Sequence, residues 1–469
     1  METRPLIIKP ILLYAEYKKV EGSSWRNWGG IQSRKDAESE LLRIRDELNK
    51  FMEHLDFPVK ILSADMVSEL KELEGIAQDI NLSDLVLLYA AGSRLIFTPG
   101  IEAPAVSLDE IRYLVSKKPV IVFIKYKTGP LYLWYEIMHA RFIRLNVNDN
   151  PAQPWLTYDD VVVDDYEELL WKLRALYALK NVRGRRVLSI GGVSGWEIGA
   201  KAAENAQKIW GLDIVNIPYS ELEEEIHYVE RNEKDLVNKV LQNYFSLGDV
   251  KVEIPQGNVE RAIILYRALR RLAERYNADA VTSPGCMSSV IKIAKTPPCF
   301  TYSILNDEGL PSICEGDFVV IPAFLFLRYL TNKPVFMGNP TYPHNNRVLM
   351  AHCTAPRKMD GRNPEPAVLL THYESDEGAA IKVLMRKGQV VTIVDPSFDG
   401  KSWVIFRGKI MDTPSYPACR TQVEIEIEGD WKLLRKKLRG FHWLLVYGDY
   451  LKEIEYALEK IGIEPILIQ

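Results

Sequence analysis

A carboxylate, an amide and two imidazoles each lie at the edge of an apolar segment in the C-terminal part of the chain. Glu315 follows a short apolar run, and Asn339 lies in a Phe-Met-Gly-Asn-Pro motif. His352 and His442 lie at the edges of two further apolar runs. Oxygen and nitrogen donors of these types are common ligands of divalent cations. If the elements that carry them end at one place, the four side chains can converge on a single metal ion.

Glu315 also has a structural interpretation. It stands where a turn-rich segment gives way to the apolar helix predicted for 319–330. A carboxylate at a helix N-terminus is commonly a cap. Asp317 lies two positions further on, and the place coincides with an expected domain junction, where clefts form. These two features favour a ligand role, and capping stays open as the alternative.

His352 and His442 are two of only seven histidines. A lone histidine on an apolar strand is more often a core residue than a ligand, and this stays the alternative. Both, however, lie where an imidazole can reach out of an apolar run into a cleft. The remaining histidines have no such setting and are taken as structural: His54, His139, His227, His344 and His372.

Two further features could bind a substrate. Trp25 and Arg26 lie in a Ser- and Gly-rich loop after the first predicted strand. Aromatic and guanidinium side chains on such a loop can stack on a sugar, and ligands bind at the carboxyl ends of parallel strands. Packing or a subunit contact explains the loop equally well. Cys286 follows another predicted strand near the supposed cleft, and without a paired histidine it is not expected to be a nucleophile.

The segment Gly191–Gly195 follows a strand and precedes a helix, as a phosphate-binding turn does. The full GxGxxG pattern is absent, and no suitably placed acidic residue follows a second strand. A tight turn is therefore the favoured interpretation. With no P-loop elsewhere, we expect no nucleotide cofactor.

Composition excludes several classes of protein. Hydrophobic residues make up 47% and charged residues 26% of 469 residues, as in folded globular proteins. A net charge of −4 and the lack of a long basic block give no reason to expect nucleic-acid binding. No apolar run has transmembrane length, and no cleavable signal is seen. The five scattered cysteines form neither a disulfide framework nor a CxxC zinc spacing, so we expect a reducing, cytoplasmic compartment.

The order of apolar runs predicts the architecture. Runs rich in β-branched residues, such as 85–89 and 120–124, alternate with amphipathic segments such as 33–55 and 108–116. This rhythm is typical of βαβ units and a parallel sheet. A second alternating series begins with the strand predicted at 185–190.

Beyond about residue 334 the pattern changes to short strands separated by turns that contain Gly or Pro, which is typical of an antiparallel sheet or barrel. Helices return near the C-terminus. We therefore expect an α/β protein with two doubly wound parallel-sheet domains followed by a small antiparallel, barrel-like domain. The expected domains are 1–180, 181–335 (which carries Glu315) and 336–469.

Several motifs together resemble the L-fucose isomerase and L-arabinose isomerase superfamily. The resemblance is strong from about Val187 to the C-terminus, and it extends to the N-terminal third by architecture and by the Trp25 loop. It rests on these segments: Thr296–Cys299, Leu305–Gly309, Cys314–Asp317, Arg328–Thr331, Pro334–Pro340, Ala351–Cys353, His442–Trp443 and Val446–Tyr450.

The resemblance implies three domains, a manganese-type divalent cation and interconversion of a small aldose with its ketose. In that chemistry the cation grips two neighbouring substrate oxygens, while a carboxylate moves a proton between C1 and C2 through an enediolate. Glu315 corresponds to the first metal-binding glutamate and His442 to the C-terminal histidine ligand. His352 corresponds to a histidine that binds metal in the arabinose branch. The resemblance also implies a homotrimer or homohexamer whose sites are completed by a neighbouring subunit.

The chain departs from the family pattern at Asn339, which stands where the second acidic ligand and acid/base is expected. An amide oxygen can bind a divalent ion but cannot exchange a proton at neutral pH. Either Glu315 does the proton transfer alone or with water, or another group substitutes for the missing acid. The candidates are Asp317, His352 and Asp307.

Two alternative functions follow from Asn339. The protein could bind a sugar or polyol without isomerising it, as a sensor or scaffold. It could instead use the same cation and enediolate for epimerisation, dehydration or aldol cleavage. The kind of metal is also open, because mixed oxygen and nitrogen ligands suit manganese, cobalt or zinc.

Overall fold

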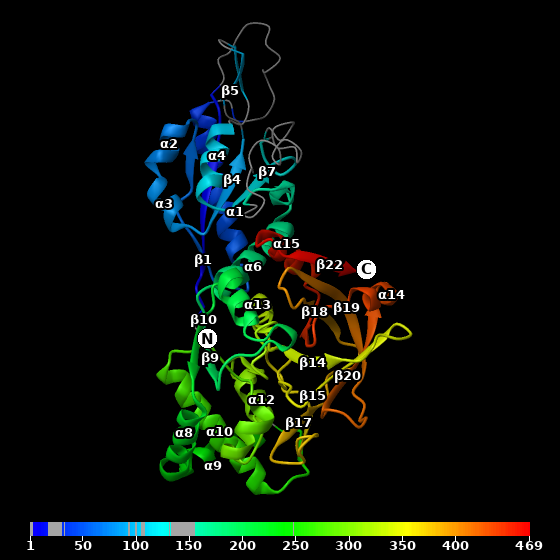
Figure 1. Cartoon of the computed structure of the whole chain (residues 1–469). Helices are drawn as coiled ribbons and strands as arrows, with labels where there is room; N and C mark the ends of the chain where they lie inside the picture. Colours follow the sequence, from blue (N-terminus) through cyan, green and yellow to red (C-terminus); the bar gives the residue numbers. More distant parts are fainter. Residues whose placement is uncertain are drawn as a thin grey trace. The chain divides into compact units, whose positions relative to one another are not determined.

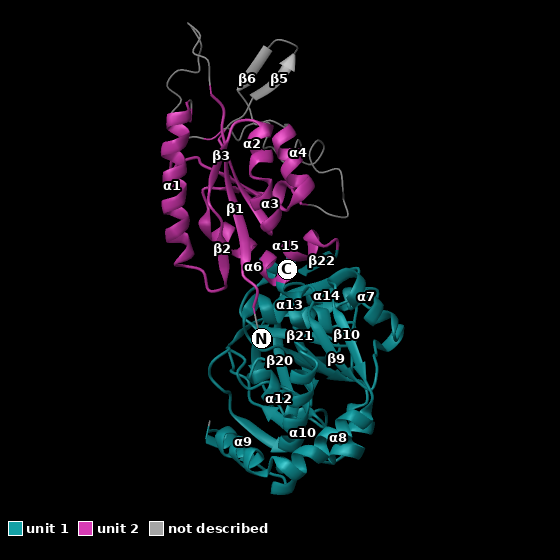
Figure 2. Ribbon diagram, turned by 90° about the vertical axis from the view of Figure 1, so that its left-hand side faces the viewer, with its two compact units in different colours: residues 1, 181–455, 463–469 teal, residues 2–180, 456–462 magenta. Residues whose placement is uncertain are grey.

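The computed structural model describes residues 3–16, 31, 33–91, 94–98, 101–104, 108–130, 132, 155–246 and 248–469. Trp25 and Arg26 lie outside these residues. The chain divides into two compact units, drawn in teal and magenta in Figure 2. Unit 1 comprises residues 1, 181–455 and 463–469, and unit 2 comprises residues 2–180 and 456–462. The predicted central and C-terminal domains fall within unit 1 except for residues 456–462, which belong to unit 2, and the boundary between them stays a prediction.

Unit 2 is built on a sheet in which all strand pairs are parallel, in the order β2-β1-β4-β7-β8, with β3 also paired to β1. Strands β4 and β7 consist entirely of buried residues, as expected where helices cover both faces of a parallel sheet. The strands are β1 (Leu6–Leu13), β2 (Val59–Ile61), β3 (Asp65–Val67), β4 (Leu85–Ala90), β7 (Val120–Ile124) and β8 (Val161–Val163). A separate antiparallel pair is formed by β5 (Arg94–Thr98) and β6 (Ile101–Pro104).

The helices of unit 2 follow its strands in alternation, as Figure 1 shows. Helix α1 begins after Ser33, whose side chain accepts a hydrogen bond from the backbone of Asp36 and caps the helix. Its buried residues recur every three or four positions, as in an amphipathic helix. The helices are α1 (Arg34–Met52), α2 (Leu70–Gly75), α3 (Ala77–Leu82), α4 (Leu108–Lys117), α6 (Tyr166–Val182) and the end of α15 (Leu451–Lys460).

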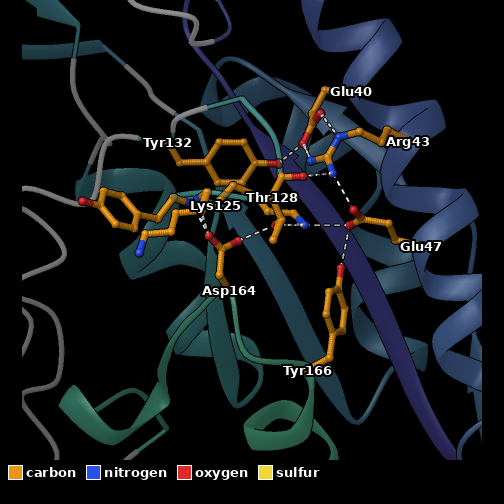
Figure 3. A network of polar contacts seen from close by, with 10 residues as sticks. Glu40, Arg43, Glu47, Lys125, Thr128, Tyr132, Asp164 and Tyr166 are labelled. Atoms are coloured by element: carbon orange, nitrogen blue, oxygen red, sulfur yellow. Dashed lines mark hydrogen bonds and ion pairs between the residues drawn. The ribbon is translucent and has the colours of Figure 1, made fainter.

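A buried polar network joins α1 to the segment after β7 (Figure 3). Lys125 is fully buried, and its Nζ lies 2.8 Å from Glu47 Oε2 and 3.0 Å from Thr128 Oγ1. Tyr166 donates a hydrogen bond of 2.6 Å to Glu47. Arg43 pairs with Glu47 at 2.5 Å, so the Glu47 carboxylate is shared by three donors.

The same network continues on the other side of Arg43. The Arg43 guanidinium forms an ion pair with the buried carboxylate of Glu40, which also accepts a hydrogen bond from the buried Tyr132 hydroxyl. Asp164 accepts a hydrogen bond of 2.6 Å from Thr128 Oγ1 and another from the Tyr126 backbone. Because each carboxylate has donors and each cation has acceptors, the network holds the carboxyl end of β7 in place.

The first half of unit 1 contains a second parallel sheet, in the order β10-β9-β12-β13. These strands are β9 (Arg186–Ile190), β10 (Asp213–Ile217), β12 (Ala280–Ser283) and β13 (Ser312–Cys314). The helices are α7 (Lys201–Trp210), α8 (Tyr219–Asn232), α9 (Lys234–Ser246), α10 (Gln256–Arg275), α11 (Ile291–Ala294), α12 (Cys299–Asp307) and α13 (Ile321–Thr331). Since all four strands run the same way, the residues that follow β9, β12 and β13 meet at one edge.

The second half of unit 1 is a closed, six-stranded antiparallel barrel in the order β18-β21-β14-β15-β20-β19, closed by pairing of β18 with β19. The predicted α/β class, with parallel sheets followed by a barrel-like β region, is confirmed. The barrel strands are β14 (Phe336–Pro340), β15 (Arg347–His352), β18 (Val390–Pro396), β19 (Ser402–Asp412), β20 (Thr421–Glu428) and β21 (Trp443–Tyr447).

Smaller elements complete unit 1. Strand β22 (Glu464–Ile468) joins β19 in parallel, and α14 (Trp431–Lys437) begins after Asp430, which caps it. A small sheet is formed by β11 (Val250–Val252), β16 (Ala367–Leu370) and β17 (Ala380–Val383). Within the described ranges, none of the helices has the length and apolar character needed to cross a membrane.

Candidate metal centre

Glu315 is positioned by the carboxyl edge of the parallel sheet in unit 1. It directly follows β13 and has a φ of 64°, a backbone conformation that is uncommon for a side chain with a Cβ. The Gly-rich turn after β9 holds this segment: the Ser194 backbone N–H donates to the Gly316 carbonyl at 3.1 Å, and the Phe318 N–H donates to the Ser194 carbonyl at 3.2 Å. Strained backbone that is held by its surroundings is a feature of functional sites.

The other three candidates are positioned by adjacent strands of the barrel. Strand β14 lies between β15 and β21. The register pairs Asn339 with Ala351, one residue before His352 at the end of β15. It also pairs Gly338 with Trp443, the residue after His442. Asn339 is therefore flanked by the two histidines, because antiparallel strands bring residues far apart in sequence to the same level.

Glu315, His352 and His442 come together as a compact cluster. One potential ligand atom from each residue lies within 4.8 Å of those of the other two. His352 Nε2 is 3.5 Å from Glu315 Oε1, and His442 Nε2 is 3.7 Å from Glu315 Oε2. Both separations are longer than an ordinary hydrogen bond, so a space remains between the Glu315 carboxylate and the two imidazole nitrogens. A carboxylate and two imidazoles are a donor set that binds manganese, zinc or a similar divalent ion.

The contacts of His442 are compatible with a cation at the cluster. Its side chain is fully buried, and its Nδ1 lies 2.7 Å from Asp317 Oδ2. That contact directs the other nitrogen, Nε2, at Glu315, where it finds no hydrogen-bond partner among the described residues. A buried unpartnered nitrogen costs about 1–3 kcal/mol. A bound cation would remove this cost, and a carboxylate behind a histidine ligand is a common arrangement at metal sites.

Asp317, for which the sequence analysis proposed a catalytic role, lies behind His442. Its side chain is buried, and its other carboxylate oxygen accepts a hydrogen bond of 3.0 Å from the Val319 backbone. It does not appear among the described residues that line the cavity above the cluster. Asp317 therefore contacts His442 from behind, and its catalytic role stays a prediction.

Asp395 holds the backbone of the turn before His442, and no motif in the sequence identifies it. Its carboxylate accepts hydrogen bonds of 2.7 Å and 2.6 Å from the backbone of Arg439 and Gly440. A Cβ on Gly440 would lie 2.4 Å from the Pro396 carbonyl, so the turn needs glycine at this position. Burial raises the pKa of Asp395 to about 7. The turn that precedes His442 is thus fixed by a buried carboxyl group.

A cavity of about 490 Å³ opens above the cluster, within the usual size range of small-molecule sites. Glu315, Asn339 and His352 contribute to its lining. Burial raises the pKa of Glu315, but the imidazoles of His352 and His442 outweigh this effect and keep the pKa below its ordinary value. Glu315 is therefore ionised at neutral pH, as a metal ligand must be.

Aromatic side chains form one wall of the cavity. The rings of Trp196 and Phe441 are 4.1 Å apart, and Trp196 also meets His442 edge-on. Trp196 has 46% of its surface exposed and a φ of 50°. A flat, half-exposed apolar surface beside polar ligands suits a sugar, which has one face of C–H groups and several hydroxyls. Trp196 and Phe441 were not identified from the sequence, because isolated aromatic residues carry no motif.

All five cysteines of the chain line the same cavity, although they are scattered in sequence. Burial raises the pKa of Cys286 to about 12, and burial also raises the pKa of Cys314. Both thiols are therefore protonated at neutral pH, and the expectation that Cys286 is not a nucleophile stays a prediction. His372, which the sequence analysis took as structural, also lines the cavity.

Of the remaining residues predicted from the sequence, one lines the cavity, one does not, and two lie outside the described residues. Cys286, proposed to bind substrate, lies in the cavity lining. Asp307, considered as a substitute acid, is not one of the described lining residues, and its carboxylate accepts a hydrogen bond of 2.8 Å from the Lys358 backbone. Trp25 and Arg26 lie outside the described residues, so their role stays a prediction.

Comparison with known proteins gives one informative similarity. No protein-family model matches the chain. A curated protein from Clostridium sp. (strain MSTE9), named sulfoquinovose isomerase, is 23% identical over 265 residues. The match covers 54% of this chain and 58% of that relative, so the chain spans less than two thirds of the length of the protein it resembles.

Proposed function

We propose that the protein is a divalent-metal-dependent isomerase that interconverts the aldose and ketose forms of a monosaccharide. The observation that carries the proposal is the convergence of Glu315, His352 and His442 beneath a cavity of suitable size. The unpartnered Nε2 of His442 supports a cation at this point. A relative whose name describes a sugar isomerase, and the motif resemblance to fucose and arabinose isomerases, support the reaction class.

The ligand set would consist of Glu315, His352 and His442, with the Asn339 amide oxygen as a fourth donor. Mixed oxygen and nitrogen donors suit manganese, although related divalent ions would also bind. A bound cation would polarise the substrate carbonyl and stabilise negative charge on the neighbouring oxygen during the reaction. Asp317 keeps His442 Nε2 directed at the site through its contact with Nδ1.

Glu315 is the group best suited to move the proton between C1 and C2. It is ionised at neutral pH, and its side chain is 18% exposed, toward the cavity. Asn339 cannot accept a proton, and Asp317 is engaged behind His442. Trp196 and Phe441 would pack against the apolar face of the sugar and exclude water from that side of the cavity. Glu315 would therefore act as both ligand and proton carrier, with a water molecule as relay.

The direct test uses protein stripped of metal and then supplied with Mn²⁺. A panel of neutral aldoses resembling fucose and arabinose is incubated with the reloaded protein, and ketose is measured by NMR. We expect at least one aldose to be converted only when metal is present. Failure of every aldose with folded, metal-loaded protein would contradict the proposal. NMR would also separate isomerisation from epimerisation or bond cleavage.

Asn339 favours a second candidate function, namely sugar binding without isomerisation. The variant Asn339→Asp restores a carboxylate that can bind the metal and exchange a proton. If the natural protein is a binding protein, the variant should gain isomerase activity that the natural chain lacks. If the natural chain is already active and the variant only changes the rate, this second candidate is excluded.

The resemblance to the fucose and arabinose isomerases further suggests a homotrimer or homohexamer. Light scattering coupled to gel filtration measures the assembly directly. A monomer at micromolar concentration would contradict this part of the proposal.

A further inference from the structure

Two of the cysteines that line the cavity stand at the ends of neighbouring strands. The register of β15 with β20 pairs His352 with Thr421. Cys353 is the residue after His352, and Cys419 lies two residues before Thr421. Continued past the strand ends, this register would place Cys353 opposite Arg420, the residue after Cys419. A disulfide needs Cα atoms about 4.4–6.8 Å apart.

The packing holds these two thiols together. Cys353 belongs to a small buried cluster with Cys299 and Ala380, and Cys419 packs against that cluster. Both side chains also line the cavity described above. The Gln422 side chain donates to the Cys419 carbonyl at 3.1 Å and fixes that segment.

The other cysteines are less suited to pairing. Cys314 Sγ is 3.0 Å from Thr354 Oγ1, with which it shares a hydrogen bond. Cys286 follows a different strand, and Cys299 begins α12. Cys419 is the one cysteine of the five that is only half-buried. An oxidant that enters the cavity therefore meets Cys353 and Cys419 as a neighbouring pair.

We propose that Cys353 and Cys419 are a modification site, a dithiol that a hydroperoxide converts reversibly into a disulfide in the wall of the cavity. In the first step one thiol sulfur attacks the peroxide, the O–O bond breaks, and a sulfenic acid forms while an alcohol or water leaves. In the second step the other thiol displaces the sulfenic hydroxyl as water and the S–S bond forms. The two sulfurs lose two electrons in total, and the peroxide gains them.

The disulfide would change the metal centre. Closing the bond brings the sulfur atoms to about 2.05 Å from each other, which pulls the backbone of Cys353 toward Cys419. The adjacent residue is His352, one of the ligands in the proposed function, on which this part of the inference rests. Oxidation therefore displaces a ligand, and reduction restores it.

The test is peptide mapping of the whole protein after treatment with hydrogen peroxide. Without reduction, mass spectrometry should find a linked pair of peptides that contain Cys353 and Cys419, and dithiothreitol should release them. The variant Cys299→Ser should still form the link. The variant Cys419→Ser should not, and dimedone should then trap a sulfenic acid on Cys353. Absence of the link in the natural protein, or a link from either cysteine to Cys299, would overturn the proposal.

A second measurement separates this inference from the proposed function. Calorimetric titration with Mn²⁺ should show at least roughly tenfold weaker binding to the oxidised protein than to the reduced protein, with no change in Cys419→Ser on oxidation. Equal Mn²⁺ affinity in both states would remove the regulatory part and leave the modification site. If the link forms but the reduced protein isomerises no sugar, the proposed function fails while the disulfide stands.

Discussion

Both units bury charged or titratable side chains. The network around Glu47 in unit 2 pairs its donors and acceptors internally, whereas the cluster around Glu315 in unit 1 does not. In unit 2, the Glu47 carboxylate forms ion pairs with Arg43 and Lys125 and accepts a hydrogen bond from the Tyr166 hydroxyl (Figure 3). Its negative charge is therefore balanced within the unit. In unit 1, Glu315 lies 3.5 Å and 3.7 Å from two imidazole nitrogens, distances at which no strong hydrogen bond is made.

Internal pairing of charges distinguishes a structural network from a ligand site. A network whose donors and acceptors match internally needs nothing from outside and stiffens the fold. A cluster made only of potential metal ligands, with a buried nitrogen left unpartnered, is unfavourable until something binds. The predictions below test this distinction, beginning with the largest expected effect.

The largest effect is expected for Glu315→Gln. Loss of the carboxylate removes the proposed metal ligand and proton carrier, so kcat/KM should fall by at least about a thousandfold, equivalent to about 4 kcal/mol. Steady-state kinetics with saturating Mn²⁺ measures the change. The control is Glu374→Gln, because Glu374 is exposed and lines the same cavity. Equal losses in both variants would contradict the special role of Glu315.

In unit 2 the corresponding change is Lys125→Met. It leaves Glu47 without its buried ammonium partner and should lower the free energy of unfolding by about 2–4 kcal/mol. Urea denaturation followed by circular dichroism gives this quantity. Mn²⁺ affinity should not change, since the network is structural. The exposed Lys127 provides the control Lys127→Met. If Lys125→Met lost Mn²⁺ binding but kept its stability, the network in unit 2 would not be purely structural.

Asp317→Asn should produce an intermediate effect. The amide is similar in size but does not hold His442 Nδ1 as a carboxylate does, so Mn²⁺ affinity should weaken about 10- to 100-fold. Isothermal titration calorimetry on the reduced protein measures it, and Asp376→Asn, at an exposed position, serves as the control. An unchanged affinity would mean that Asp317 does not support a metal ligand.

The last effect concerns pH and the carboxyl group of Asp307, a partly buried residue. Burial raises its pKa to about 7 from an ordinary value of 3.8. The folded state therefore binds a proton that the unfolded state has already lost between these values. The contribution of Asp307 to the free energy of unfolding should be greatest below about pH 4. It should fall as pH rises toward 7, with a slope of at most about 1.4 kcal/mol per pH unit.

Asp307→Asn should flatten this part of the stability curve, because the amide has no proton to lose. Thermal unfolding between pH 4 and pH 8 measures the slope, and the exposed Asp235→Asn is the matched control. If the slope of Asp307→Asn equals that of the unchanged protein, Asp307 does not account for the pH dependence.

The residue types and the kind of fold could be predicted from the sequence. Alternation of β-branched and amphipathic segments predicted the parallel sheets, and short runs with Gly or Pro turns predicted the antiparallel barrel. These signals are local, because hydrophobic periodicity is set by each strand or helix alone. The same local signal identified the four candidate ligands, because each lies at the end or edge of an apolar run: Glu315, Asn339, His352 and His442.

Which of these residues meet, and which contacts each makes, depends on how the strands pair and pack. The pairing of β14 with β15 and β21 brings Asn339 between two histidines, and Asp317 reaches His442 across 125 positions of the chain. Strand register and sheet closure are set by packing over the whole unit, not by neighbouring residues. For that reason the orienting role of Asp317, the gathering of the thiols and the aromatic wall could not be foreseen from the sequence.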